Sequence, residues 1–150
     1  MELHFEPVTG QNREAVLALR TAPGQEGFIE TVDQCLDEAA SRKCWRPVGI
    51  YDGPLLVGFS MYGKFPLEGF PFGRVWLDRL LIDARYQGRG YGKAALSGLT
   101  ERLRREYRCK KIYLSVIPGN GRAQKLYTDF GFRSTGKFDP HGEEIFVYRF

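Results

Sequence analysis

The segment VWLDRLLIDARYQGRGYGKAAL, residues 75–96, joins a dense run of apolar residues to a glycine-rich stretch and then to a helical pattern. We predict a strand over about 74–83 and a helix over about 90–107, with a turn between them. The next apolar run, at 111–117, predicts a second strand. A strand, a helix and a further strand in this order are typical of a parallel crossover. The rest of the chain is organised around this unit.

The turn inside this segment carries three glycines at alternate positions, Gly88, Gly90 and Gly92. Glycine lacks the Cβ atom that would keep backbone amides away from a ligand, and it adopts a positive φ without strain. The first amides of the following helix have no partners within the helix and lie at the positive end of its dipole. These features predict a phosphate-binding turn, and Arg89 and Lys93 add positive charge beside it.

Three glycine motifs compete for this turn. A Walker loop, GxxxxGK followed by Ser or Thr, fails because Gln87 and Ala94 stand at its first and last positions. A Rossmann pattern fits the glycines, but the next strand ends at 115–117 without the carboxylate that would hold a ribose. The third pattern, Q-x-x-G-x-G, is matched by Gln87, Gly90 and Gly92.

This third pattern closely resembles the acetyl-coenzyme A pyrophosphate loop of the GCN5-related N-acetyltransferases, the GNAT family. In that family the loop and its helix are followed by a strand, then by N-x-x-A-x-x-L-Y, and then by G-F. This chain has the strand IYLSV, followed in the same order and spacing by Asn120, Ala123, Leu126, Tyr127, Gly131 and Phe132. Through WRPVGIYDG, VGFSMYGKF, GRVWLDRLLID and GEEIFVY the chain is also similar to one branch, the bacterial spermine/spermidine (diamine) N-acetyltransferases.

The resemblance implies an α/β (α+β) fold, with a central mixed, mostly antiparallel sheet of about seven strands flanked by about four helices. The parallel strand-helix-strand would lie at the acetyl-coenzyme A site. Hairpin signals in the first half of the chain argue against a doubly wound parallel sheet, and we expect one domain over 1–150. Strands are expected near 3–8, 46–51, 55–63, 74–83, 111–117, 132–138 and 143–149, and helices near 13–20, 28–41, 90–107 and 121–130.

Composition excludes several other classes of protein. The three cysteines, Cys35, Cys44 and Cys109, are widely spaced and form no C-x-x-C pair, so neither a disulfide framework nor a metal site is indicated. The first ten residues are too polar for a signal peptide, and no apolar run approaches the length of a membrane span. We therefore expect a cytoplasmic enzyme without a metal and without a membrane partner.

Charge is distributed unevenly along the chain. Residues 85–111 hold nine Lys or Arg and two acids, whereas residues 21–41 hold five acids and no Lys or Arg. Either run can be a solvated helix face. As a pair, a basic lobe beside the phosphate turn suits an anionic cofactor, and an acidic segment suits a cationic substrate. Acetyl-coenzyme A and a small cationic amine such as a polyamine form such a pair.

The resemblance assigns cofactor roles by position. Leu80, Leu81 and Ile82 would run along the pantetheine arm through their backbone, with the Ile82 amide polarising the thioester carbonyl. Asn120 and Ala123 match a second cofactor contact. The pyrophosphate would lie on the turn that contains Gln87, Gly88, Arg89, Gly90, Tyr91, Gly92 and Lys93.

The same resemblance makes Tyr127 the general acid toward the departing thiolate. A tyrosine has a reference pKa of ~10, so it carries its proton at neutral pH. On residue type alone, a tyrosine in this helix could equally be a core aromatic.

The acceptor amine must lose a proton before it attacks, which costs about 4 kcal/mol near neutral pH for a primary alkylamine. Asp78 is the candidate base, acting directly or through water, because it lies mid-strand among apolar residues. Related diamine acetyltransferases carry an acid at this strand position. An ion pair with Arg74 or Arg79 is the alternative role, and strand alternation predicts that Arg79 points to the opposite face.

Substrate contacts are expected from the acidic residues Glu26, Glu30 and Asp33, then from Asp78 and from Glu143 near the C-terminus. A homodimer is expected from the family. Alternative acceptors are a protein N-terminus, a lysine, an amino acid or an aminoglycoside, and a pseudo-enzyme that only binds the cofactor also stays open. A basic nucleic-acid-binding domain is a different class. It would leave the Asn120–Phe132 motif unexplained, and we expect no nucleic-acid partner.

Overall fold

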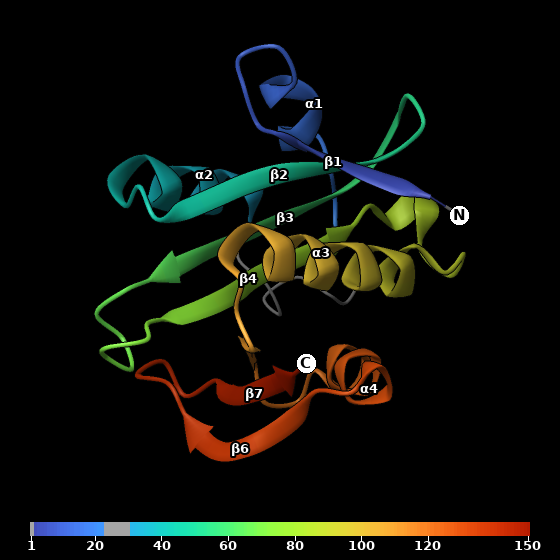
Figure 1. The fold of residues 1–150 in the computed structure, drawn as a ribbon. Helices are drawn as coiled ribbons and strands as arrows, with labels where there is room; N and C mark the ends of the chain where they lie inside the picture. Colours follow the sequence, from blue (N-terminus) through green and yellow to red (C-terminus); the bar gives the residue numbers. More distant parts are fainter. Residues whose placement is uncertain (1, 23–30) are drawn as a thin grey trace.

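The computed structural model describes residues 2–22 and 31–150. Its strands are β1 (Leu3–Pro7), β2 (Trp45–Asp52), β3 (Leu55–Phe65), β4 (Arg74–Ile82), β5 (Lys111–Val116), β6 (Arg133–Phe138) and β7 (Glu144–Arg149). They form one sheet in the order β1-β2-β3-β4-β5-β7-β6 (Figure 1). Neighbours pair antiparallel except β4 and β5, which pair parallel. The predicted mixed, mostly antiparallel sheet is confirmed.

The described helices are α1 (Arg13–Leu17), α2 (Val32–Ser41), α3 (Tyr91–Tyr107) and α4 (Gly121–Phe130). The first helix ends at Leu17 rather than near 20, and the predicted start of the second at 28 lies outside the described residues. Within the described part, α2 begins with a capping box, in which the Thr31 hydroxyl accepts from Gln34 N and the Gln34 side chain accepts from Thr31 N. A short 3-10 helix, Ala84–Tyr86, follows β4 and was not predicted.

The two faces of the sheet carry separate cores. On one face, α3 and α4 cover a cluster that includes Leu77, Leu96 and Leu99. On the other face, α1 and α2 bury Val16 and Leu36 together with Phe59, Met61 and Leu81. Alternate side chains of one strand point to opposite faces, so β3 contributes to both cores. The sheet is thereby fixed between two helical layers, and β4 lies near its middle.

A β-bulge interrupts the pairing of β3 with β4. Tyr62 is opposite Leu77 and Met61 is opposite Arg79, so Asp78 is the extra residue. The bulge breaks the alternation of side chains, and Arg79 Nη1 lies 3.1 Å from Asp78 Oδ1. The prediction that Arg79 turns away from Asp78 is therefore wrong, because a rule of strict alternation does not anticipate a bulge.

The parallel pair of β4 and β5 is short. Its register holds at one position, Trp76 opposite Tyr113. Beyond that point β4 continues through Leu80–Ile82 without pairing to β5. The last residues of β4 therefore keep backbone groups that β5 does not use, and the site lies beside them.

Candidate active site

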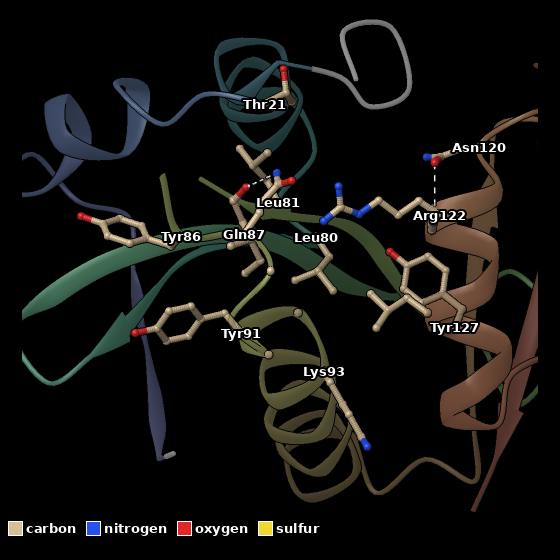
Figure 2. A pocket seen from close by; sticks show the side chains of 16 residues that line it. Thr21, Leu80, Leu81, Tyr86, Gln87, Tyr91, Lys93, Asn120, Arg122 and Tyr127 are labelled. Carbon is tan, nitrogen blue, oxygen red and sulfur yellow. Dashed lines mark hydrogen bonds between the residues drawn. The ribbon is translucent and has the colours of Figure 1, made fainter. Parts of the chain in front are cut away.

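A pocket of about 310 Å³ lies between the end of β4, the loop that follows it and the N-terminal ends of α3 and α4 (Figure 2). Every residue predicted to bind the cofactor lines this pocket except Arg89, and Tyr127 lines it too. The lining residues that were not predicted to bind are Thr21, Tyr86, Arg122 and Leu126. Two helix N-termini therefore face one concavity whose other wall is aliphatic. This arrangement suits a ligand with an anionic end and a long neutral arm.

The glycine turn has the backbone that a phosphate site requires. Gly88 has φ 78° and Gly90 has φ 86°, and Gly90 is the N-cap of α3. A Cβ atom at either position would meet nothing within 4 Å, so their conformation, not crowding, requires glycine. Gly92 lies in the first turn of α3 and has no positive φ, so the expectation that all three glycines use this freedom is wrong for Gly92.

Replacing Gly90 by Ala tests this turn. The loop must either hold alanine in the left-handed region, which lowers the free energy of unfolding by about 1–2 kcal/mol, or abandon that conformation. In the second case acetyl-coenzyme A binding weakens by about tenfold, the equivalent of about 1.4 kcal/mol. Thermal unfolding and calorimetric titration measure the two quantities. Gly121→Ala is the matched control, because Gly121 is helical with open space around it. Equal behaviour of the two variants would contradict the role given to the turn.

Asp83, which the sequence analysis missed, fixes the start of the loop. Its buried carboxylate accepts from Arg20 N at 3.1 Å, from Arg85 N at 2.9 Å and from Arg85 Nε at 2.8 Å. Burial alone would raise the pKa of Asp83, but the hydrogen bonds from Arg85 and Arg20 hold it below its usual value. The segment after α1 is thus tied to the loop. In the sequence, Asp83 is simply an aspartate where an apolar run ends and a loop begins. This pattern is too common to mark a residue that fixes the site.

Two further side chains set the shape of the loop. The Gln87 amide donates from Nε2 to Ile82 O at 2.9 Å, which holds the loop against the end of β4. The Tyr91 hydroxyl donates to Asp52 Oδ2 at 2.6 Å and anchors the first turn of α3 to the β2–β3 hairpin. This hydrogen bond raises the pKa of Tyr91. Figure 2 shows the Tyr91 ring turned away from Tyr127, so Tyr91 can offer its backbone to the pocket.

The basic residues of the turn are placed differently from one another. The Arg89 guanidinium lies 5.9 Å from the centre of the Tyr86 ring, and Arg89 is not among the pocket's lining residues. Lys93 lines the pocket, but Figure 2 shows its ammonium directed away from Leu80 and Tyr127.

At the second helix, Asn120 serves as the N-cap of α4 and accepts through Oδ1 from Ala123 N at 3.3 Å. Arg122 follows in the first turn, and its guanidinium extends over the pocket toward Leu80 (Figure 2). Arg122 carries the cation nearest to the middle of this view. The sequence analysis did not select it, because one arginine among many basic residues has no distinguishing pattern.

Tyr127 comes from the second turn of α4, and its ring packs edge-on against Phe132 with centroids 5.8 Å apart. Figure 2 shows its hydroxyl directed into the pocket toward Arg122. Burial raises the pKa of Tyr127 to about 12, while the positive charge of Arg79 acts in the opposite direction. The phenol therefore keeps its proton throughout the neutral range. It can donate that proton to a base formed in the pocket.

Asp78 does not line the pocket but lies two residues before Leu80, which does. Its side chain is 16% exposed and that of Arg79 is 11% exposed. Arg79 Nη1 donates both to Asp78 Oδ1 at 3.1 Å and to the Asp78 carbonyl at 2.9 Å. The ion pair with Arg79, which is the alternative to a catalytic role for Asp78, is thus present. Contact with a guanidinium favours the charged form of a carboxylate, which can still accept a proton but is a weaker base than an unpaired one.

Of the acids that are expected to contact the substrate, the structure describes Asp33, Asp78 and Glu143. Glu143 Oε1 accepts from the Ser115 hydroxyl at 3.2 Å. Ser115 lies on β5, two residues after Tyr113, where β5 pairs with β4. Asp33 is exposed in the first turn of α2. Glu26 and Glu30 lie outside the described residues.

Neither a metal site nor a membrane-spanning helix is found among the described residues. Residues 2–22 and 31–150 contain no group of three His, Cys, Asp or Glu side chains that could hold a metal ion. In the same part of the chain, no helix is both long and apolar enough to cross a membrane.

The chain is similar to known acetyltransferases in sequence and in structure. The family model described as "Acetyltransferase (GNAT) family" matches residues 13–132. The chain is 44% identical over 149 residues to "Spermine/spermidine N(1)-acetyltransferase" of Bacillus subtilis (strain 168), which covers 98% of each protein. The crystal structure of an acetyltransferase from Thermus thermophilus has a TM-score of 0.75 at 22% identity and covers 100% of this chain and 98% of that one. The structure of AAC(6')-Ib in complex with Parmomycin and AcetylCoA has a TM-score of 0.81 at 19% identity and covers 99% and 94%.

The chain thus combines a parallel strand-helix-strand, a glycine turn at a helix N-terminus and a second helix N-terminus beside it. The chain belongs to the Acetyltransferase (GNAT) family. It is an acetyl-coenzyme A-dependent N-acetyltransferase, as the sequence resemblance predicted.

Proposed function

We propose that the enzyme acetylates a primary amine of a polyamine, spermidine, spermine or a related diamine, by direct attack in a ternary complex. The observation that carries the acceptor is the 44% identity, along 98% of both chains, to a protein named for spermine and spermidine. The acidic run of residues 21–41, which holds five acids and no Lys or Arg, supports a cationic acceptor.

In this proposal the chain's own groups hold the cofactor. The end of β4 that does not pair with β5, Leu80–Ile82, offers its backbone to the pantetheine arm, and the amides of residues 88–93 take the pyrophosphate. Asn120 and Ala123 frame the second helix N-terminus, and Arg122 adds a cation over the pocket. The open space beside Gly88 and Gly90 leaves room for a ligand against this backbone.

Acetyl-coenzyme A supplies an acetyl group whose carbon–sulfur bond breaks as the bond from amine nitrogen to acyl carbon forms. Asp78, which contacts Arg79, accepts the proton that the ammonium substrate must lose, and a water relay fits its place outside the pocket. Tyr127 gives its proton to the departing thiolate. Glu143 and Asp33, with Glu26 and Glu30, would hold the remaining positive charges of the polyamine.

The proposal also covers the oligomeric state of the enzyme and the cellular compartment in which it works. We infer one N-acetyltransferase domain over residues 1–150, working as a homodimer in the cytoplasm. The described surface exposes Phe138 and Phe150, apolar side chains of the kind that a second copy would cover. No disulfide joins Cys35, Cys44 or Cys109 in the described part of the chain, as a reducing compartment permits.

A thiol-release assay with acetyl-coenzyme A and a panel of amines tests the acceptor. The panel contains spermidine, spermine, putrescine, an aminoglycoside and a peptide with a free lysine, all at one moderate ionic strength. We expect kcat/KM for the best polyamine to exceed that of the aminoglycoside and the peptide by at least a hundredfold. Turnover confined to the other acceptors would keep the enzyme class and refute the polyamine.

A further inference from the structure

A second cavity, of about 610 Å³, lies at the end of the β4–α3–β5 unit that is opposite to the cofactor pocket. It is bounded by the β3–β4 loop, the start of β4, the end of α3 and the start of β5. The cofactor pocket uses instead the end of β4 and the start of α3. Since α3 has 17 residues, the two sites lie about 25 Å apart along the helix. Figure 1 shows the β3–β4 loop on the side of the molecule where α3 ends.

The lining of this second cavity is strongly basic. Lys64, Arg74, Arg108, Lys110 and Lys111 line it, and among the described residues no Asp or Glu does. None of these five cations forms a salt bridge with a carboxylate in the described part of the chain. Uncompensated charges of one sign around a concavity concentrate ions of the opposite sign.

The acids that are nearest in sequence are engaged elsewhere. Glu68 accepts from Trp76 Nε1 at 2.8 Å, and Glu106 accepts from the Tyr62 hydroxyl at 2.9 Å. Neither acid forms a salt bridge with a cation of the cavity in the described part of the chain.

Helix capping does not explain this cluster. A cation near the end of α3 stabilises the helix dipole, and Arg108, in the left-handed region at φ 52°, is the C-cap of that helix. Lys64 comes from β3, Arg74 from β4 and Lys111 from β5, so three other elements bring cations to the same cavity. Four separate elements thus bring cations to one cavity.

The cavity also has aromatic walls. Tyr107, Tyr113 and Phe72 line it, and Arg74 stacks on the Tyr113 ring at 5.0 Å, which fixes the direction of its guanidinium. Phe72 is 86% exposed, so its ring faces are open to a planar ligand. Stacking on an aromatic side chain and phosphate binding by Lys and Arg are the two means by which proteins hold nucleotides.

We propose that this second cavity binds a nucleoside polyphosphate, with the phosphates on the five cations and the base on Phe72. The site does not depend on which amine the enzyme acetylates. It is also separate from the cofactor pocket, with which it shares no lining residue.

Calorimetric titration of ATP into the protein, preloaded with one equivalent of coenzyme A, tests the proposal at fixed moderate salt. We expect one ATP to bind beside the coenzyme A. The double variant Lys110→Gln/Lys111→Gln should weaken ATP binding at least tenfold, whereas Lys125→Gln/Lys137→Gln, the same charge change on α4 and β6, should change it less than twofold. Absence of ATP binding beside coenzyme A, or equal losses in the two double variants, would overturn the proposal.

Two further readouts locate the ligand and separate its parts. Phe72→Ala should weaken ATP about fivefold or more and leave inorganic triphosphate unchanged, because Phe72 contacts only the base. Cys109 lines the cavity, so ATP should slow its alkylation, read by mass spectrometry, without protecting Cys44. Equal losses for ATP and triphosphate, or protection of neither cysteine, would contradict the placement.

Discussion

Tyr127→Phe should lower kcat by about a hundredfold or more while the affinity for acetyl-coenzyme A changes less than twofold. General acid catalysis contributes roughly 10²–10⁴-fold, and phenylalanine keeps the ring that packs on Phe132. Steady-state rates by thiol release and coenzyme A titration measure the two quantities. Tyr148→Phe is the control, because Tyr148 also packs against Phe132, at 5.3 Å, without lining the pocket. Full activity of Tyr127→Phe would refute the assignment.

The pH dependence of the wild-type enzyme gives a second test of Tyr127. Burial raises its pKa to about 12, above the ordinary value of 10. A raised folded-state pKa means that the protonated form is favoured below pH 10 and is lost only as the pH rises through about 12. The wild-type rate should therefore show no fall centred near pH 10. A fall centred there that disappears in Tyr127→Phe would show that the phenol titrates as if exposed.

Asp78→Asn should lower kcat/KM for spermidine by about a hundredfold at pH 7, within the range of general base catalysis, and by progressively less as the pH rises toward ~10. The reason is that a primary amine deprotonates by itself near its own pKa of ~10.4 and then needs no base. Full pH profiles of the wild type and the variant measure this. Asp129→Asn, at an exposed ion pair on α4, is the matched control and should be neutral.

A loss that is the same at every pH would contradict the base assignment. It would indicate that Asp78 acts by positioning Arg79, whose guanidinium it binds at 3.1 Å. Thermal unfolding of the variant separates both cases from simple loss of structure.

The fold could be predicted largely from local patterns. Apolar periodicity and turn residues placed α4 at 121–130 and most strand ends within a residue or two, because each element has a distinct period and a clear break. The bulge at Asp78 could not be predicted in this way, since it depends on how β3 pairs with β4 and not on the residues of β4 alone.

The pocket could be predicted where backbone geometry requires a residue type. Gly88 and Gly90 adopt positive φ, so their residue type indicates their role, whereas Asn120, which caps a helix, is assigned through the family resemblance. Arg122 and Asp83 could not be selected. Their importance comes from where the fold brings them, over the pocket in one case and against Arg20 and Arg85 in the other.

The measurement that tests the central claim most directly is the initial rate of thiol release with acetyl-coenzyme A and spermidine varied together. Direct transfer in a ternary complex predicts turnover with intersecting double-reciprocal lines, and no acetyl group on the protein after incubation with acetyl-coenzyme A alone. Parallel lines together with an acetylated enzyme would show a covalent route. That result would contradict the roles given to Asp78 and Tyr127.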